Sequence, residues 1–351
     1  MFIAGLGTAA PPQRYTQLEC WETAQRAAHF QQLSPRSRAI LRKVLTANNG
    51  ITTRHLALAD LTEAFDLNPD ALQARFVQNA PLLAAQAAQR ALQNAGASAR
   101  DIDALLISTC TGYLCPGLTS YVGELLGLLP EVLALDLVGQ GCGAALPNLR
   151  AAEALLAAGR CRRVLSICVE VCSAAFFWDN DPGVLISACL FGDGAGAAVL
   201  ANESNGHRRL EWKMGGSLIN PADRDLLRFE QRGGMLRNVL SPQVPGLAAA
   251  QAERVLASVL GQGPCPREGI NQWLLHPGGR DVLVALRQRL GLSEQDTRWS
   301  AAVLAEYGNL SSASLFFVLE AALAGRAPGG YWWMASFGAG FSGHGALLQV
   351  D

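Results

Sequence analysis

Apolar runs and polar breaks alternate along most of this chain. Short apolar runs that end at glycine or at polar residues predict buried strands, and longer runs with helical spacing predict helices. The predicted strands cover residues 1–7, 104–109, 132–138, 163–171, 194–200, 210–214 and 272–275, and the predicted helices cover residues 118–128, 142–159 and 244–260. This alternation predicts an α/β fold in which helices cover the faces of a sheet.

A polar break at residues 202–207 divides the pattern into two parts. The glycine-rich segments 190–196 and 336–341 resemble each other, and each adjoins an apolar strand, which is a weak sign of internal duplication. We therefore predict two halves of similar layout, residues 1–205 and residues 206–351. A functional site is expected where the halves meet, because binding sites are common at such junctions.

Composition indicates a chain with a large interior. Half of the 351 residues are hydrophobic, 16% are charged, and the formal net charge is −1. Disordered chains carry more charge and nucleic-acid-binding domains are usually basic, so neither class is favoured. The start of the chain lacks the pattern of a secretory signal, and no apolar stretch is long enough to span a membrane. We therefore expect a cytoplasmic protein with no nucleic-acid partner and no membrane span.

The nine cysteines are expected to be reduced in such a compartment. Their spacings, such as Cys110 to Cys115 and Cys168 to Cys172, lack the paired pattern of zinc sites, and the five histidines are scattered. The sequence therefore predicts no metal site.

One cysteine stands at a position that favours reactivity. Cys142 follows a predicted strand and a glycine-containing break, and an alanine- and leucine-rich segment with helical character follows it. The N-terminus of a helix offers unpaired N–H groups and a partial positive charge, which favour the thiolate over the thiol. Most cysteines in such a chain are inert core residues, so this context is what makes Cys142 a candidate nucleophile.

Two later segments supply chemical partners for this cysteine. His276 follows the apolar run 273–275 and precedes Pro-Gly-Gly, so its imidazole is expected at the tip of a strand. Asn309 follows Gly308 at a second break, and taken alone it would be interpreted as a turn residue. Together the three residues predict a Cys-His-Asn catalytic set, with the nucleophile in the first half and its partners in the second.

Such a set can perform acyl transfer. A Cys142 thiolate paired with a His276 imidazolium can capture an acyl group from a thioester. Decarboxylation of a malonyl thioester leaves an enolate, whose oxygen needs the hydrogen-bond donors that His276 and the Asn309 amide can supply. The carbanion can then attack the acyl group on Cys142, and this chemistry requires no metal or redox cofactor.

Several segments of the chain jointly resemble the type III polyketide synthases, the chalcone synthase-like branch of the thiolase superfamily. These segments are residues 109–112, 116–117, 141–142, 190–194, 244–247, 276–279 and 307–312. The resemblance implies a duplicated fold with α-β-α-β-α layers, in which each half contains a mixed five-stranded sheet. It implies repeated decarboxylative condensation of malonyl-CoA with an acyl starter on Cys142, while His276 and Asn309 polarise the thioester carbonyls. It also implies that Phe191 is a gatekeeper of the cavity, and that the protein is a homodimer with Cys115 near the neighbouring subunit's cavity.

The resemblance also implies a set of cavity residues. An alignment without gaps puts Asn238 where a second aromatic gatekeeper is expected. It puts further cavity positions at Cys110, Thr111, Cys172, Ala175 and Ser311. Three of these lack the hydroxyl group expected there, and the small, fairly apolar lining suggests a medium or long fatty acyl starter and an alkylpyrone or alkylresorcinol product. An aryl starter or a malonyl-primed route to polyhydroxylated aromatics would need only a modest change of shape, and the same side chains can also serve only as core packing.

The expected coenzyme A entrance is altered. The family's basic positions align with Leu41, Val44 and Asn48. Nearby basic residues that can substitute are Arg42, Lys43 and Arg54. Alternatively, an acyl carrier protein delivers the starter, and its acidic surface meets Arg36, Arg38 and Arg42, unless these residues form only a solvated basic face. Near the C-terminus, the segment 336–340 departs from the family's Gly-Phe-Gly-Pro-Gly, and His344 has no assigned role.

Three other functions were weighed. A ketoacyl carrier-protein synthase III uses the same chemistry for a single condensation, but there Gln-Ala-Asn is expected where Pro-Gly-Gly follows His276. A papain-like protease has the same residue order, but Cys142 lies in the middle of the chain and lacks a following tryptophan. A non-catalytic partner of another condensing enzyme would have no reason to keep Cys142, His276 and Asn309 together.

Overall fold

The computed structural model describes residues 1–204 and 208–351. The end of the predicted polar break and the predicted boundary between the halves fall at residues 205–207, outside the described residues.

Among the described residues, nine strands form one mixed sheet in the order β11-β12-β13-β8-β1-β7-β6-β4-β5. Their bounds are β1 Phe2–Ala9, β4 Ala104–Ser108, β5 Leu133–Leu137, β6 Arg163–Glu170, β7 Gly194–Ala201, β8 Leu210–Ile219, β11 Ile270–Leu275, β12 Gly330–Gly338 and β13 Ser342–Val350. Strand β4 pairs in parallel with β5 and β6, and β11 pairs in parallel with β12, whereas the other pairs are antiparallel. Strands β1 and β8 are joined by a single residue pair, Phe2 with Glu211. Because this link is so short, the sheet consists of two parts, one on each side of it.

The prediction of five strands in each half is right for the first part of the sheet and wrong for the second. The second part has four strands among the described residues, β11, β12, β13 and β8. Two further strands, β9 (Leu227–Arg232) and β10 (Met235–Leu240), form a separate hairpin. These strands carry several arginines and a glutamate, and most of their side chains are only half buried, so they do not suit the interior of the main sheet.

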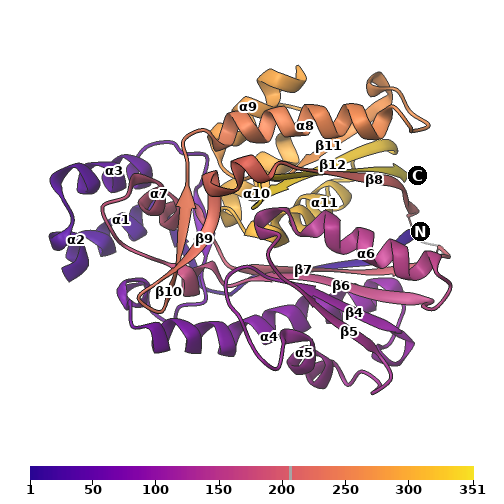
Figure 1. Ribbon diagram of the computed structural model, residues 1–351, viewed down its shortest axis with the longest axis horizontal. Helices are drawn as coiled ribbons and strands as arrows, with labels where there is room; N and C mark the ends of the chain where they lie inside the picture. The colour runs from indigo at the N-terminus through magenta and orange to yellow at the C-terminus, as the bar shows by residue number, and fades with distance from the viewer. Residues whose placement is uncertain (205–207) are drawn as a thin grey trace.

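The helices form three layers around the two parts of the sheet (Figure 1). Helix α4 covers the outer face of β1, β7 and β6, and α8 covers the outer face of β8 and β13. Helices α6 and α11 lie between the two parts and contact strands of both. The helix bounds are α1 Gln17–Arg26, α2 Ala28–Gln32, α3 Pro35–Thr46, α4 Pro69–Ala95, α5 Leu118–Leu126, α6 Ala145–Ala157, α7 Pro182–Leu190, α8 Val244–Leu260, α9 Arg280–Leu290, α10 Arg298–Tyr307 and α11 Ser314–Ala324. The predicted α-β-α-β-α layering is thus confirmed.

The predicted elements agree with the observed ones except at some of their ends. Helix α8 has the predicted bounds, but the helix predicted from residue 142 begins at Ala145, because residues 141–143 form a 3-10 turn. Strand β8 continues to Ile219, five residues beyond the prediction, because Gly215 and Gly216 interrupt its apolar pattern but still pair with β13. Helices α1 and α3 pack with α7 around a small separate core at the left of Figure 1. No helix among residues 1–204 and 208–351 is long and apolar enough to cross a membrane.

Candidate active site

Cys142 lies in the 3-10 turn Gly141–Gly143, between β5 and α6. Behind this turn runs β12, whose Ser336 hydroxyl donates a hydrogen bond of 2.9 Å to the carbonyl oxygen of Gly143. His344 of β13 is buried beside the same turn, and its Nδ1 lies 2.8 Å from the Ser217 hydroxyl. The cysteine is therefore held on a short turn that packs against the end of the second part of the sheet.

His276 and Asn309 lie at chain breaks, as predicted. His276 follows β11 directly and is 3% exposed, and its backbone N–H donates to the carbonyl of Ala335 in β12. Asn309 follows α10, and its side-chain amide donates to the carbonyl of Gly278 at 3.2 Å, in the turn after His276. This bond connects the histidine turn with the asparagine.

The backbone around Asn309 is fixed by pairing with the end of α7. The Asn309 N–H donates to the carbonyl of Leu190, and the Gly192 N–H donates to the carbonyl of Asn309. Gly308 allows this approach, because it has a φ of +72° and a Cβ there would lie 2.7 Å from the Leu190 oxygen. Phe191, the predicted gatekeeper, is thereby placed directly beside Asn309.

Ser311 connects the asparagine with the nucleophile. Its backbone N–H donates to the Oδ1 of Asn309 at 2.9 Å, and its hydroxyl donates to the Cys142 sulfur at 3.2 Å. Its φ of +50° is unusual for a residue with a side chain, and such strain tends to occur at functional sites. The structure thus brings the predicted residues Cys142, Asn309 and Ser311 into one chain of contacts, which reaches the turn after His276.

Glu170, at the end of β6, belongs to the same site but was missed from the sequence. It is completely buried and accepts hydrogen bonds from a ring of small polar groups. The donors are Thr109, Cys110, Thr111 and Ser312, and the Ser311 hydroxyl lies 3.3 Å from the same carboxylate. The signal that could have found it is a glutamate between Val169 and Val171 in a mostly apolar segment, because a buried carboxylate needs many hydrogen bonds.

Burial changes the ionisation of the two proton-carrying groups. Burial raises the pKa of the Cys142 thiol to about 12, although the hydrogen bond from Ser311 opposes this shift, and the charge of Glu170 adds to it. Burial also lowers the pKa of His276 to about 4. Both groups are therefore neutral near pH 7. Burial thus opposes the resting thiolate and imidazolium that the sequence predicts, because desolvation disfavours both charged forms.

This ionisation predicts how fast Cys142 reacts with iodoacetamide. Because the thiolate is the reactive form, the rate at Cys142 is expected to keep rising with pH above 9, without a plateau near neutrality. Ser311→Ala removes a hydrogen bond that lowers the Cys142 pKa, so it should slow the reaction by about fivefold at pH 8. Peptide mass spectrometry measures both rates, with added N-acetylcysteine as the reference thiol. A plateau below pH 7 would instead show a preformed thiolate.

Most of the predicted cavity residues line one pocket with an empty volume of about 340 Å³, counting space open to solvent. Those residues are Thr111, Cys172, Ala175, Phe191, Asn238 and Ser311. Cys110 lies beside the pocket through its contacts with Ser311 and Glu170. The wall also contains Phe176, Phe177 and Phe229, which the sequence comparison did not place there. Phenyl rings therefore narrow a cavity that was expected to have a lining of small residues.

One residue proposed for the coenzyme A entrance cannot serve there. Arg54 is 4% exposed, and its guanidinium donates to the carbonyls of Ala188 and Phe191 and to the side chain of Gln17. It therefore supports the gatekeeper segment from inside the protein. By contrast, Arg42 and Lys43 are exposed on α3, where they can meet a ligand.

Three comparisons with known proteins agree on one family. Residues 1–204 match the N-terminal domain, and residues 227–331 the C-terminal domain, of the chalcone and stilbene synthases. The chain is 31% identical to the 3,5-dihydroxyphenylacetyl-CoA synthase of Streptomyces toyocaensis, covering 99% of this chain and 89% of that protein. It is 30% identical to the alpha-pyrone synthesis polyketide synthase-like Pks18 of Mycobacterium tuberculosis, covering 91% and 82%. The crystal structure of PKS-I from the brown alga Ectocarpus siliculosus superposes with a TM-score of 0.90 at 28% identity, covering 99% and 98% of the two chains.

Proposed function

The chain belongs to the chalcone and stilbene synthase family and is a type III polyketide synthase, and from this premise we propose that Cys142 carries an acyl starter extended repeatedly by malonyl-CoA. The observation that carries the proposal is the chain of contacts from Cys142 through Ser311 and Asn309 to the turn after His276. Under the proposed division, the nucleophile comes from residues 1–205 and its partners come from residues 206–351.

Loading of the starter begins from a neutral pair. As the Cys142 sulfur attacks the thioester carbonyl, the His276 imidazole takes the thiol proton, a task that suits a neutral base. The carbonyl carbon forms a bond to the cysteine sulfur and loses its bond to the sulfur of coenzyme A. The departing thiolate then receives the proton from His276, and the cysteine is left acylated.

Extension uses His276 and Asn309 as hydrogen-bond donors. When a malonyl thioester loses carbon dioxide, negative charge develops on its carbonyl oxygen, and positioned donors stabilise that charge. The Asn309 amide has two hydrogens, of which one is bonded to Gly278 and the other can face a substrate. The carbanion attacks the acyl carbon on Cys142, a carbon–carbon bond forms, and the cysteine leaves as a thiolate. Transfer of the longer chain back to Cys142 permits another cycle.

The pocket supports a compact product. Four phenylalanines, Phe176, Phe177, Phe191 and Phe229, occupy much of its wall. We therefore propose a short or medium acyl starter that leads to a pyrone or resorcinol, and place long fatty acyl groups outside the preferred range. One relative is named for an aromatic product and another for alpha-pyrones. Product analysis should therefore look for both pyrones and phenols.

Product analysis tests the proposed function. The purified protein is incubated with malonyl-CoA and acyl-CoA starters of increasing length, and products are identified by mass spectrometry. Pyrones or phenols with several malonyl-derived units, formed best from short or medium starters, would support the proposal. A product with a single extension would support the ketoacyl synthase alternative. Reaction only with carrier-protein thioesters would assign delivery to an acyl carrier protein, and silence with every thioester would support the non-catalytic alternative.

We also propose that the protein is a homodimer that pairs through β5. This strand is the edge of the sheet, and Leu133, Leu135 and the following Val138 are exposed on the single chain. Exposed apolar edge strands favour association with another chain. Cys115 is also exposed, as expected if it reaches toward a neighbouring subunit.

A charge on this edge should separate the subunits. Leu135→Lys is expected to convert the dimer into a monomer at micromolar concentration, because it places a charge in the apolar contact. Analytical ultracentrifugation measures the mass, and Ile219→Lys, which alters an exposed residue at the end of β8, is the matched control. A wild-type monomer, or a dimer that persists in the Leu135 variant, would contradict the proposed interface.

A further inference from the structure

The β9–β10 hairpin forms one wall of the pocket. Phe229 of β9 and Asn238 of β10 pair directly across the two strands, and both line the pocket. The hairpin is not part of the main sheet, so its position depends on side-chain contacts with other elements. Strand β10 packs against α7, which contributes Val184, Ser187 and Ala188 to the same pocket.

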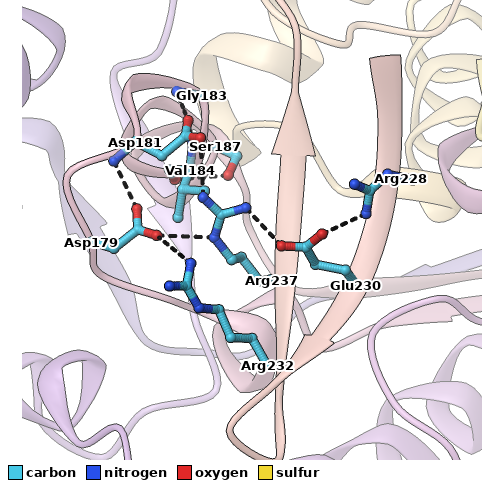
Figure 2. Close-up of polar contacts among 9 residues, drawn as sticks. All are labelled: Asp179, Asp181, Gly183, Val184, Ser187, Arg228, Glu230, Arg232 and Arg237. Carbon is cyan, nitrogen blue, oxygen red and sulfur yellow. Dashed lines mark hydrogen bonds and ion pairs between the residues drawn. The ribbon is translucent and has the colours of Figure 1, made fainter. Parts of the chain in front are cut away.

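Arg237 makes the strongest polar contacts between this hairpin and the rest of the protein (Figure 2). It precedes Asn238 in the chain and is 8% exposed. Its Nε lies 2.9 Å from Asp179 Oδ2, its Nη2 lies 3.0 Å from Asp181 Oδ2, and its Nη1 lies 2.9 Å from Glu230 Oε1. Each of the three nitrogens of this largely buried guanidinium thus donates a hydrogen bond to a different carboxylate.

These carboxylates lie on both sides of the contact. Glu230 follows Phe229 in β9 and is the cross-strand partner of Arg237, so this ion pair lies next to the Phe229–Asn238 pair. Asp179 and Asp181 instead precede α7. The guanidinium therefore connects the hairpin with the start of α7, as the dashed contacts in Figure 2 show.

The α7 side of the contact is itself rigid. Oδ1 of Asp181 accepts the backbone N–H of Gly183 at 2.8 Å and caps α7, while Oδ2 binds Arg237. Asp179 Oδ1 accepts the N–H of Asp181 at 2.8 Å. A Cβ at Gly183 would lie 2.2 Å from the carbonyl oxygen of Leu240, so the end of β10 packs directly on this helix turn. Each aspartate thus uses one oxygen for its own loop and the other for the hairpin.

We propose that Arg237 is a positioning residue that clamps the Phe229–Asn238 wall against α7 and thereby limits the length of the acyl chain that the pocket accepts. The size limit rests on the proposed polyketide-forming function, whereas the clamp itself does not. Without the guanidinium, the two aspartates repel each other and the hairpin loses its two short ion pairs with the segment before α7. The wall can then move outward, which widens the pocket on the side lined by Phe229 and leaves Cys142 in place.

Arg237→Gln tests the proposal, with Arg232→Gln as the matched control. Arg232 lies on the same hairpin and faces Asp179 at 3.8 Å, but its side chain is 64% exposed, so its loss should change little. For Arg237→Gln we expect at least about tenfold faster amide hydrogen exchange in residues 227–240. The ratio of kcat/KM for a long starter to that for a short starter should rise by about fivefold or more, whereas the rate of Cys142 alkylation should stay unchanged. Arg237→Lys should restore part of both effects.

A second variant covers the case in which Arg237→Gln does not fold. Asp179→Asn keeps the oxygen that accepts from Asp181 and removes one charge from the clamp, so it should shift exchange and selectivity in the same direction by a smaller amount. Unchanged exchange in residues 227–240, or a lower melting temperature with an unchanged starter ratio, would overturn the proposal. If the wild-type protein forms no polyketide from any thioester, the proposed function fails, and the exchange measurement alone then decides whether the clamp exists.

Discussion

Replacing Cys142 by alanine is expected to lower the rate of polyketide formation by at least about a thousandfold, because the proposed mechanism holds the acyl chain on this thiol. The Cys110 thiol is also near the Ser311 hydroxyl, with 3.3 Å between Sγ and Oγ. Its Sγ is, however, also hydrogen-bonded to Glu170. Burial, together with the charge of Glu170, raises the pKa of the Cys110 thiol well above its ordinary value, so it is a poor substitute. Product formation by the variant, measured by mass spectrometry with malonyl-CoA and a short acyl-CoA, checks this prediction.

The same variant separates the two chemical steps. Decarboxylation of malonyl-CoA needs His276 and Asn309 but not the thiol, so Cys142→Ala should still release carbon dioxide from malonyl-CoA. An unchanged melting temperature would show that the turn at residues 141–143 is intact. Polyketide formation at the wild-type rate by the alanine variant would contradict the assignment of Cys142 as the carrier of the chain.

Asn309→Asp is expected to lower kcat/KM for polyketide formation by about a hundredfold to a thousandfold, the usual cost of removing one donor to a developing oxyanion. The aspartate keeps the oxygen that accepts the Ser311 N–H, but it loses the amide donor and sets an oxygen against the carbonyl of Gly278. The rate of carbon dioxide release from malonyl-CoA should fall with it, because the enolate loses the same donor.

Asn49→Asp is the matched control for this substitution. The Asn49 side chain makes the same kinds of bonds, accepting from the N–H of Ile51 and donating to the carbonyl of Val44, but it takes no part in the contacts that link Cys142 through Ser311 to the turn after His276. Its variant should keep nearly full activity. A similar loss of kcat/KM in the two variants would mean that Asn309→Asp acts by disturbing the local backbone. It would contradict the role of the Asn309 amide as a donor to the reacting oxygen.

The sequence was sufficient to predict the layers of the fold and to locate Cys142, His276 and Asn309 at chain breaks. Cys142, His276 and Asn309 each follow a glycine-containing or strand-ending break, and such breaks leave side chains at the edge of a sheet. Their connection through Ser311 could not be predicted, because it depends on the strained backbone of that residue and on the approach of residues 190–192.

The errors have physical causes that a single sequence does not show. Arg54 is basic and close in the chain to the expected coenzyme A entrance, but its guanidinium is bonded inside the protein to two backbone carbonyls and to the side chains of Gln17 and Cys20. The thiolate state of Cys142 was inferred from local context, whereas desolvation is a property of the folded surroundings. Phe229 lines the pocket because the β9–β10 hairpin is separate from the main sheet. No local sequence pattern predicts this separation.

The most direct test of the central claim is to trap the growing chain on the enzyme. The protein is mixed with a short acyl-CoA and a small excess of malonyl-CoA, quenched in acid within seconds, and examined by intact-mass and peptide mass spectrometry. The account predicts adducts on the peptide that contains Cys142, with masses of the starter and of the starter lengthened by successive two-carbon units, and none at that position in Cys142→Ala. Adducts on another residue, or product formation without an adduct at Cys142, would contradict it.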